Sequence, residues 1–167
     1  MMGTINIRTV RRSHAFLDYG ADFCYQEYST TKNEEHARKM AAASQRGGPP
    51  PEKIQEMIDA GRLPKPGEGP GPEARAVSTF ATTHYAESAS GARAVARVSG
   101  GEAGYEETAK MVCEAGLSLA LEFDACPGSK GGGFLTPASA MGTVLADRLN
   151  AAGIVVEVAE PATAAKL

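Results

Sequence analysis

The sequence has no tryptophan, few aromatic side chains and only three cysteines. Aromatic residues make up 6% of the chain, so any core must consist mainly of aliphatic side chains. Cys24, Cys113 and Cys126 are widely spaced and form no CxxC pair, which argues against a disulfide framework or a zinc site. We therefore expect a cytoplasmic or otherwise reducing compartment. Cys113 falls in an apolar segment and is expected in the core.

Basic clusters and long apolar runs are also missing. The chain has 17 Lys and Arg against 20 Asp and Glu, a net charge of −3, and no Lys/Arg-rich run. This balance argues against nucleic-acid binding, which needs clustered basic side chains. No apolar run approaches the roughly 18 residues of a membrane span, so we predict no transmembrane segment. Residues 1–17 carry three arginines and no acid, so mitochondrial targeting stays an alternative.

The first half of the chain reads as short elements interrupted by glycine and proline. The expected elements are a strand leading into a short helix over residues 5–19, a strand over 23–28, a helix over 31–43 capped by Thr31, and a helix over 52–60 that follows Pro51. Residues 63–72 contain four prolines and three glycines, and we interpret them as an ordered loop over the surface.

The second half shows stronger patterns. Its expected elements are a strand pair over 76–87 and 93–99, a helix over 105–123, a flexible turn over 128–133, a helix from the N-cap Thr136 to residue 151, and a closing strand over 154–158. The helix over 105–123 is apolar around much of its circumference, with a seam through Val112, Leu119 and Phe123, so we expect it to be buried on more than one side. Together these elements predict an α+β fold, with a mixed β-sheet covered by helices, in one domain over 1–160 with a loose tail over 161–167.

Two glycine-rich segments precede the two long helices. Neither GGEAGYEETAK (100–110) nor GGGFLTPAS (131–139) has the GxGxxG or P-loop order. We expect no cofactor bound by this chain alone and no Rossmann domain within it. Three histidines without HxH or HxxxH spacing argue against a metal site. Glycines before a helix N-terminus can bind an anion, but tight packing of the turn is the commoner outcome.

Two segments that follow one another along the chain resemble the C-terminal region of the saccharopine dehydrogenase-like oxidoreductases. They are VSGGEAGYEETAKM (98–111) and GGGFLTPASAMGTVLADRLNAAGI (131–154). The similar branch is the one that includes the trans-acting enoyl reductases. Two earlier segments also resemble sequences of the family, RRSHAFLDYGADFCYQEY (11–28) and LPKPGEGPGPEAR (63–75). The resemblance therefore covers nearly the whole chain. One departure is Ala103, where the family tends to have proline.

The resemblance implies a substrate-binding and dimerisation domain without the family's N-terminal Rossmann domain. It implies hydride transfer to a lipid-like or polyketide-like double bond, with NAD(P) supplied only by a partner chain. An obligate protein partner or a homodimer is expected, and the catalytic residues stay unassigned. In this interpretation a ligand cleft at the two helix N-termini is lined by Tyr105, Thr108, Lys110, Thr136 and Ser139.

Two alternatives stay open. The domain could have become a non-catalytic structural or accessory subunit of a larger assembly, in which case the same five positions pack against protein. The chain could also be a truncated enzyme, and the doubled Met1-Met2 start weighs against that.

Overall fold

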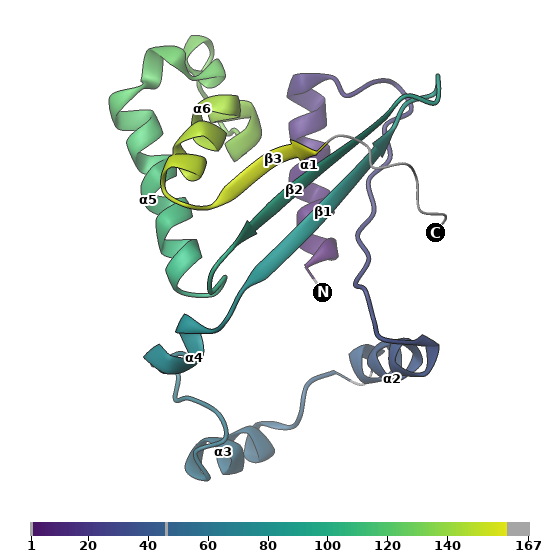
Figure 1. Cartoon of the computed structure of the whole chain (residues 1–167), viewed down its shortest axis with the longest axis vertical. Helices are drawn as coiled ribbons and strands as arrows, with labels where there is room; N and C mark the ends of the chain where they lie inside the picture. The colour runs from purple at the N-terminus through teal and green to yellow at the C-terminus, as the bar shows by residue number, and fades with distance from the viewer. Residues whose placement is uncertain (1, 46, 160–167) are drawn as a thin grey trace. The chain divides into compact units, whose positions relative to one another are not determined.

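The structure is a computed structural model that describes residues 2–45 and 47–159 (Figure 1). These residues divide into two units, one formed by residues 2–11 and 19–70 and the other by 12–18 and 71–159. Helix α1 (Gly3–Leu17) contributes to both units. The single domain over 1–160 stays a prediction, and the tail over 161–167 lies outside the described residues.

The start of the chain differs from the expectation. Where the sequence predicted a strand before a short helix, α1 is helical from Gly3 onward, and Met2 accepts hydrogen bonds from the amides of Ile5 and Asn6. The strand prediction was wrong because the β-branched residues here have no neighbouring strand. A helix satisfies its own backbone groups, whereas a strand needs a partner.

The rest of the first unit contains two surface helices. Residues 23–28, expected as a strand, form no strand, because the structure pairs no other strand with them. Helix α2 (Glu34–Gln45) is capped by Asn33, whose Oδ1 accepts from the amide of His36 at 2.9 Å, so the Thr31 cap was wrong by two residues. Helix α3 (Pro51–Asp59) begins at proline as predicted.

The second unit combines a small sheet with helices. After the short helix α4 (Pro72–Ala76), which was not predicted, strands β1 (Phe80–Glu87) and β2 (Arg93–Gly100) form the predicted hairpin. Strand β3 (Val155–Ala159) pairs with the other side of β2, which gives the order β1-β2-β3 (Figure 1). The α+β class is confirmed. All described pairings are antiparallel, so the parallel pairing of a mixed sheet is not among them.

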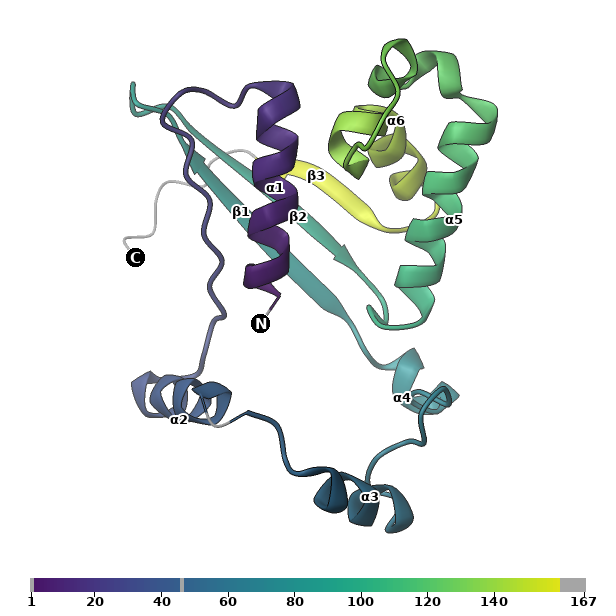
Figure 2. The same ribbon diagram turned by 180° about the vertical axis from the view of Figure 1, so that it is seen from behind.

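Two long helices accompany this sheet, α5 (Glu106–Leu121) and α6 (Pro137–Ala151). Between them lie two 3₁₀ helices, η1 (Phe123–Ala125) and η2 (Pro127–Lys130), where the sequence predicted a flexible turn from residue 128. Figure 2 shows α5 and α6 from behind, joined by this compact segment. Gly128 allows it, because a Cβ there would lie 2.6 Å from Cδ1 of Leu135.

Helix α5 is oriented opposite to the expectation. Its side chains with the least exposure are polar, Glu107 at 4% and Ser118 at 0%, and its Glu114 pairs with Arg148 of α6. The seam that the sequence predicted to be buried is exposed, with Val112 at 67% and Leu119 at 45%. The prediction was wrong because ion pairs to α6 set the rotation of the helix about its axis. Cys113, expected in the core, is exposed for the same reason.

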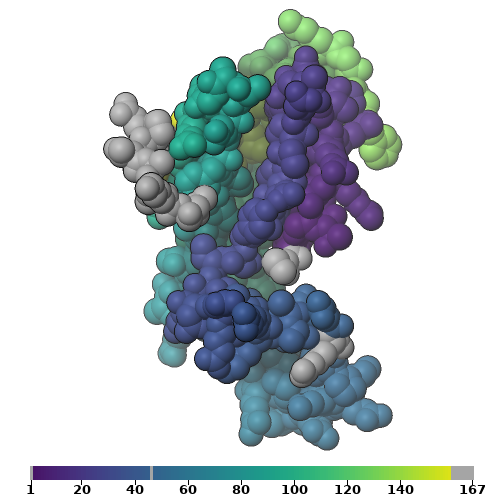
Figure 3. All heavy atoms as spheres, turned by 90° about the vertical axis from the view of Figure 1, so that its right-hand side faces the viewer, coloured from purple at the N-terminus to yellow at the C-terminus, as the bar shows by residue number. Residues whose placement is uncertain are grey.

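Few apolar side chains are buried in the described part of the chain, namely Cys126, Met141 and Ile154. The space-filling view shows the β1–β2 hairpin, in teal, reaching the molecular surface (Figure 3). No helix among residues 2–45 and 47–159 has the length and apolar character that crossing a membrane requires.

Candidate functional site

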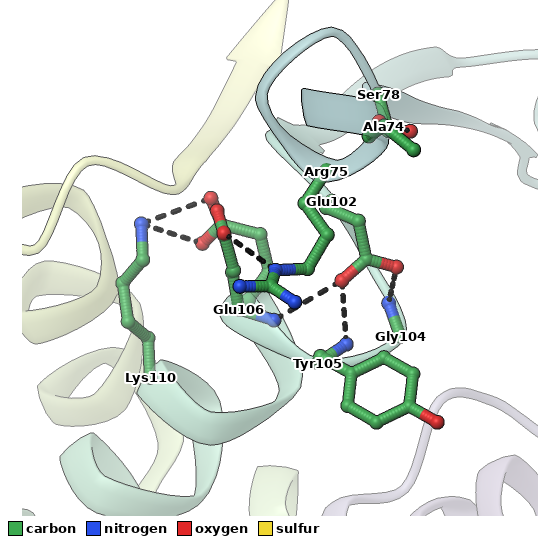
Figure 4. Close-up of polar contacts among 9 residues, drawn as sticks. Ala74, Arg75, Ser78, Glu102, Gly104, Tyr105, Glu106 and Lys110 are labelled. Atoms are coloured by element: carbon green, nitrogen blue, oxygen red, sulfur yellow. Dashed lines mark hydrogen bonds and ion pairs between the residues drawn. The ribbon is translucent and has the colours of Figure 1, made fainter. Parts of the chain in front are cut away.

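The start of α5 is held by the chain's own carboxylate. Glu102, which is 8% exposed, accepts hydrogen bonds from the amides of Gly104 at 2.7 Å, Tyr105 at 2.6 Å and Glu106 at 3.2 Å (Figure 4). The bond from the Tyr105 amide is the main reason why the pKa of Glu102 lies below its ordinary value. Glu102 thus occupies the position that an external anion would take at this helix terminus.

A second buried carboxylate follows one turn later. Oε1 of Glu107 accepts from the amide of Gly101 at 2.9 Å, and Nζ of Lys110 lies 2.9 Å from Oε1 and 2.8 Å from Oε2. Burial alone would raise the pKa of Glu107, but the hydrogen bonds from Lys110 and Gly101 outweigh it and lower the pKa. This carboxylate therefore fixes the end of β2 against the first turn of α5.

Three of the predicted substrate-binding residues lie in this first turn. Tyr105 is 48% exposed, and its ring points away from the side where Lys110 lies (Figure 4). Thr108 donates to the carbonyl of Ala103 at 2.5 Å, and Lys110 pairs with Glu107. Tyr105 is the one of the three with an exposed ring available for a ligand, while the other two bind the chain itself.

The other two predicted residues lie at the start of α6. Thr136 and Ser139 form a capping box, in which Oγ1 of Thr136 accepts from the Ser139 amide at 3.3 Å and Oγ of Ser139 accepts from the Thr136 amide at 2.9 Å. Oγ of Ser13, from α1, lies 2.7 Å from Oγ1 of Thr136. The predicted N-cap is confirmed. The two groups of predicted residues belong to separate hydrogen-bond networks, one around Glu102 and Glu107 and one around Ser13.

An apolar hollow of about 210 Å³ lies between α6 and the sheet. Its walls come from β2, β3 and successive turns of α6: Val98, Pro137, Ala138, Gly142, Leu145, Ala146, Leu149 and Val156. None of the five predicted residues lines it, although Pro137 and Ala138 lie between Thr136 and Ser139 in the sequence. The volume is below the ~300 Å³ of a typical ligand pocket, so the hollow suits part of an apolar chain.

Gly142, one of the residues that line the hollow, interrupts helix α6. Its backbone has φ 54° and ψ −132°, and a Cβ at this position would meet Cγ of Pro127 at 2.9 Å. Only glycine adopts this conformation without strain. The i, i+4 spacing of Leu145 and Leu149 was a sequence signal for this wall. The break at Gly142 had no such signal, because it depends on the approach of η2.

Comparison with known proteins found relatives along most of the chain. A Mycobacterium tuberculosis protein whose name places it among the trans-acting enoyl reductases is 34% identical over 165 residues, which is 92% of this chain and 39% of that protein. The trans-acting enoyl reductase of Mycobacterium ulcerans is 33% identical over 171 residues, 93% of this chain and 39% of its own length. A further trans-acting enoyl reductase of Mycobacterium tuberculosis is 32% identical over 160 residues, 90% of this chain and 38% of that protein.

The chain is similar to proteins named trans-acting enoyl reductases and spans about two fifths of their length. No protein-family model matches the chain, and no solved structure matches it.

Proposed function

We propose that this chain is the substrate-binding and dimerisation part of a saccharopine dehydrogenase-like enoyl reductase, and that it acts with a separate NAD(P)-binding polypeptide on a lipid-like or polyketide-like substrate. The observation that carries the proposal is the apolar hollow between α6 and the sheet, in a chain that matches 39% of a protein named for enoyl reduction. The hollow would hold an aliphatic part of the substrate, because its lining offers apolar contacts only.

The N-termini of α5 and α6 do not fit a dinucleotide. At α5 the carboxylate of Glu102 already accepts from three backbone amides, and at α6 the hydroxyls of Thr136 and Ser139 form the cap. A pyrophosphate would have to displace a buried carboxylate from the first of these sites. This arrangement supports placing the NAD(P) site on the partner polypeptide.

The sheet offers a surface for that partner. Among the described strands β1 pairs only with β2, and seven of its eight residues are exposed. The strand carries no lysine or proline, the residues that natural proteins use to protect a free edge. We propose that the NAD(P)-binding polypeptide covers this side of the sheet.

The first experiment isolates the protein from its source and identifies, by mass spectrometry, the chains that copurify in stoichiometric amounts. We expect a chain with a Rossmann-type sequence, and the complex should oxidise NADPH in the presence of enoyl thioesters. A stoichiometric assembly without such a chain would overturn the split-enzyme proposal.

The hollow is tested separately by calorimetric titration of acyl thioesters of increasing chain length into the protein. Ala138→Trp, which places a large ring in the hollow, should weaken binding at least tenfold. Ala151→Trp, at the exposed end of the same helix, is the matched control and should bind like the wild type. Equal binding by both variants would remove the hollow from the substrate site.

The exposed apolar seam of α5 favours a second candidate function, that of a non-catalytic accessory subunit in a larger assembly. The two functions predict different results in the calorimetric titration. An accessory subunit should bind no acyl thioester, and Ala138→Trp should leave its assembly unchanged.

A further inference from the structure

The face of the sheet that forms one wall of the apolar hollow continues beyond the hollow onto β1. In an antiparallel sheet, residues directly opposite each other point to the same face, and so do residues two apart along a strand. Val98 lines the hollow, and its partners in the register are Val156 on β3 and Thr82 on β1. Thr82 therefore lies on the face that forms the wall, and His84 follows it on that face.

This face is apolar except at these two positions. Thr82 and His84 are the polar residues that the three described strands place on it, and both are exposed. The other residues on the face are Phe80, Ala86, Ala94, Ala96, Val98, Gly100, Val156 and Val158. Ligand sites typically combine apolar walls with a few polar groups that orient the ligand. The two polar residues next to the hollow have this arrangement.

The hydrogen bonds of Thr82 determine which nitrogen of the His84 ring carries the proton. Oγ1 of Thr82 donates to the carbonyl oxygen of Val98 at 3.5 Å and lies 3.2 Å from Nε2 of His84. A hydroxyl has one proton to donate, so Nε2 of a neutral ring must donate to Oγ1. Nδ1 then carries a lone pair, and it has no hydrogen-bond partner among the described residues. This nitrogen can accept a hydrogen bond from a ligand.

We propose that Thr82 and His84 form the polar end of the site in the hollow, and that the ligand is an aliphatic chain bearing a hydroxyl group. The inference rests on the proposed function, which places an aliphatic part of the substrate in the hollow. The hydroxyl donates to Nδ1 of His84, and the carbons beyond it lie against Val98 and α6. Diagonal neighbours on adjacent antiparallel strands lie about 7–8 Å apart, so one chain of several carbons reaches from Val98 to His84.

Two acyl thioesters that differ in one hydrogen-bond donor test the proposal by calorimetric titration. The probes are β-hydroxydecanoyl-pantetheine and β-methoxydecanoyl-pantetheine, which share the chain and the thioester. The wild type should bind the hydroxy compound roughly three- to tenfold more tightly, as one added hydrogen bond implies. Equal affinity for the two probes would overturn the role of His84.

Variants of His84 show whether this preference comes from its ring. His84→Phe keeps a ring without nitrogen, so the preference should disappear while the affinity for the methoxy probe stays unchanged. His84→Asn should retain the preference, because its side-chain oxygen can take the place of Nδ1 as an acceptor. Thr83→Val, on the opposite face of the same strand, is the matched control and should bind like the wild type. A preference that persists in His84→Phe would overturn the proposal.

The tautomer of His84 is measured directly by proton–nitrogen correlation spectra of the ring. We expect the neutral ring of the wild type to carry its proton on Nε2. Thr82→Val removes the hydroxyl that fixes this tautomer, so both tautomers should appear and the preference for the hydroxy probe should fall. A wild-type ring with its proton on Nδ1 would overturn the proposal.

The titrations separate this inference from the proposed function. Binding of both probes with equal affinity, weakened by Ala138→Trp, would leave the hollow as a substrate site and remove His84 from it. Failure of the wild type to bind either probe would overturn the hollow as a substrate site, and this inference with it.

Discussion

Ser13 Oγ and Thr136 Oγ1 lie 2.7 Å apart, although 123 residues separate them in the sequence. Both side chains are buried, at 5% and 7% exposure, and Oγ1 of Thr136 is also 3.0 Å from Oγ of Ser139. A short hydroxyl network therefore ties the second half of α1 to the cap of α6. Because Pro137 and Ala138 follow directly, the same network positions one wall of the apolar hollow.

Removal of the Thr136 hydroxyl should destabilise the protein. Thr136→Ala loses the N-cap and leaves the buried Ser13 hydroxyl without this partner, so the free energy of unfolding should fall by about 1–3 kcal/mol. Thr136→Ser keeps the cap and should lose less. The exposed Thr143→Ala, in the same helix, is the control. Urea unfolding measures all three, and equal stability of Thr136→Ala and Thr143→Ala would contradict the role of the network.

Arg148 should be required for the orientation of α5. Its side chain is 22% exposed and bridges two carboxylates, with Nε 2.8 Å from Oε2 of Glu114 and Nη1 2.6 Å from Oε1 of Glu122. Arg148→Met leaves both acids without this cation and should lower the free energy of unfolding, an effect that added salt should reduce because the pairs are partly exposed to solvent.

A double-mutant cycle with Glu114→Gln separates the pair from other effects of the substitution. The two changes should be non-additive, since they remove the same interaction. Additive losses would show that Arg148 acts through something other than Glu114.

The stability of the protein should fall in acid because of Glu102 and Glu107. The pKa of each carboxyl lies below the ordinary value of 4.5 in the folded protein, mainly through the Tyr105 amide for Glu102 and, against the effect of burial, through Lys110 for Glu107. A lowered pKa stabilises the fold at pH values above 4.5, and the contribution is lost as the pH falls through the folded-state pKa.

Lys110→Met tests this prediction for Glu107. Without the ammonium group the folded-state pKa of Glu107 should rise toward its ordinary value, so the variant should be less stable than the wild type at neutral pH and should lose less stability as the pH falls below 4.5. Urea unfolding across a pH series measures the difference. An unchanged acid profile in this variant would show that the pair contributes no pH dependence.

Replacing Gly142 and Gly116 with alanine should have opposite effects on the free energy of unfolding. Gly142→Ala places a Cβ at φ 54° and 2.9 Å from Pro127, so it should destabilise the protein by about 1–3 kcal/mol. Gly116→Ala lies within α5 with open space around its Cβ and should stabilise the protein by up to about 1 kcal/mol. Thermal unfolding compares the two variants with the wild type. Equal effects would show that the break in α6 is not fixed by Gly142.

Several features of the fold depend on neighbouring residues alone and could be predicted before the structure. Thr136 followed by Pro137 fixed the start of α6, Gly153 its end, and the alternation around residues 80–100 the β1–β2 hairpin. These signals work because caps and turns, and the side-chain period of a strand, are set within a few residues. The α+β class followed from them.

Which surfaces are buried and which segments pair depends on contacts between residues far apart in the sequence. Residues 5–10 and 23–28 have the composition of strands, but a strand forms only where another strand takes its hydrogen bonds. The sequence showed the apolar seam of α5 and could not show its direction. That direction depends on Arg148, which is 34 residues from Glu114 and 26 from Glu122. The rotation of a helix about its axis is a property of its distant contacts, and here polar contacts leave the apolar side exposed.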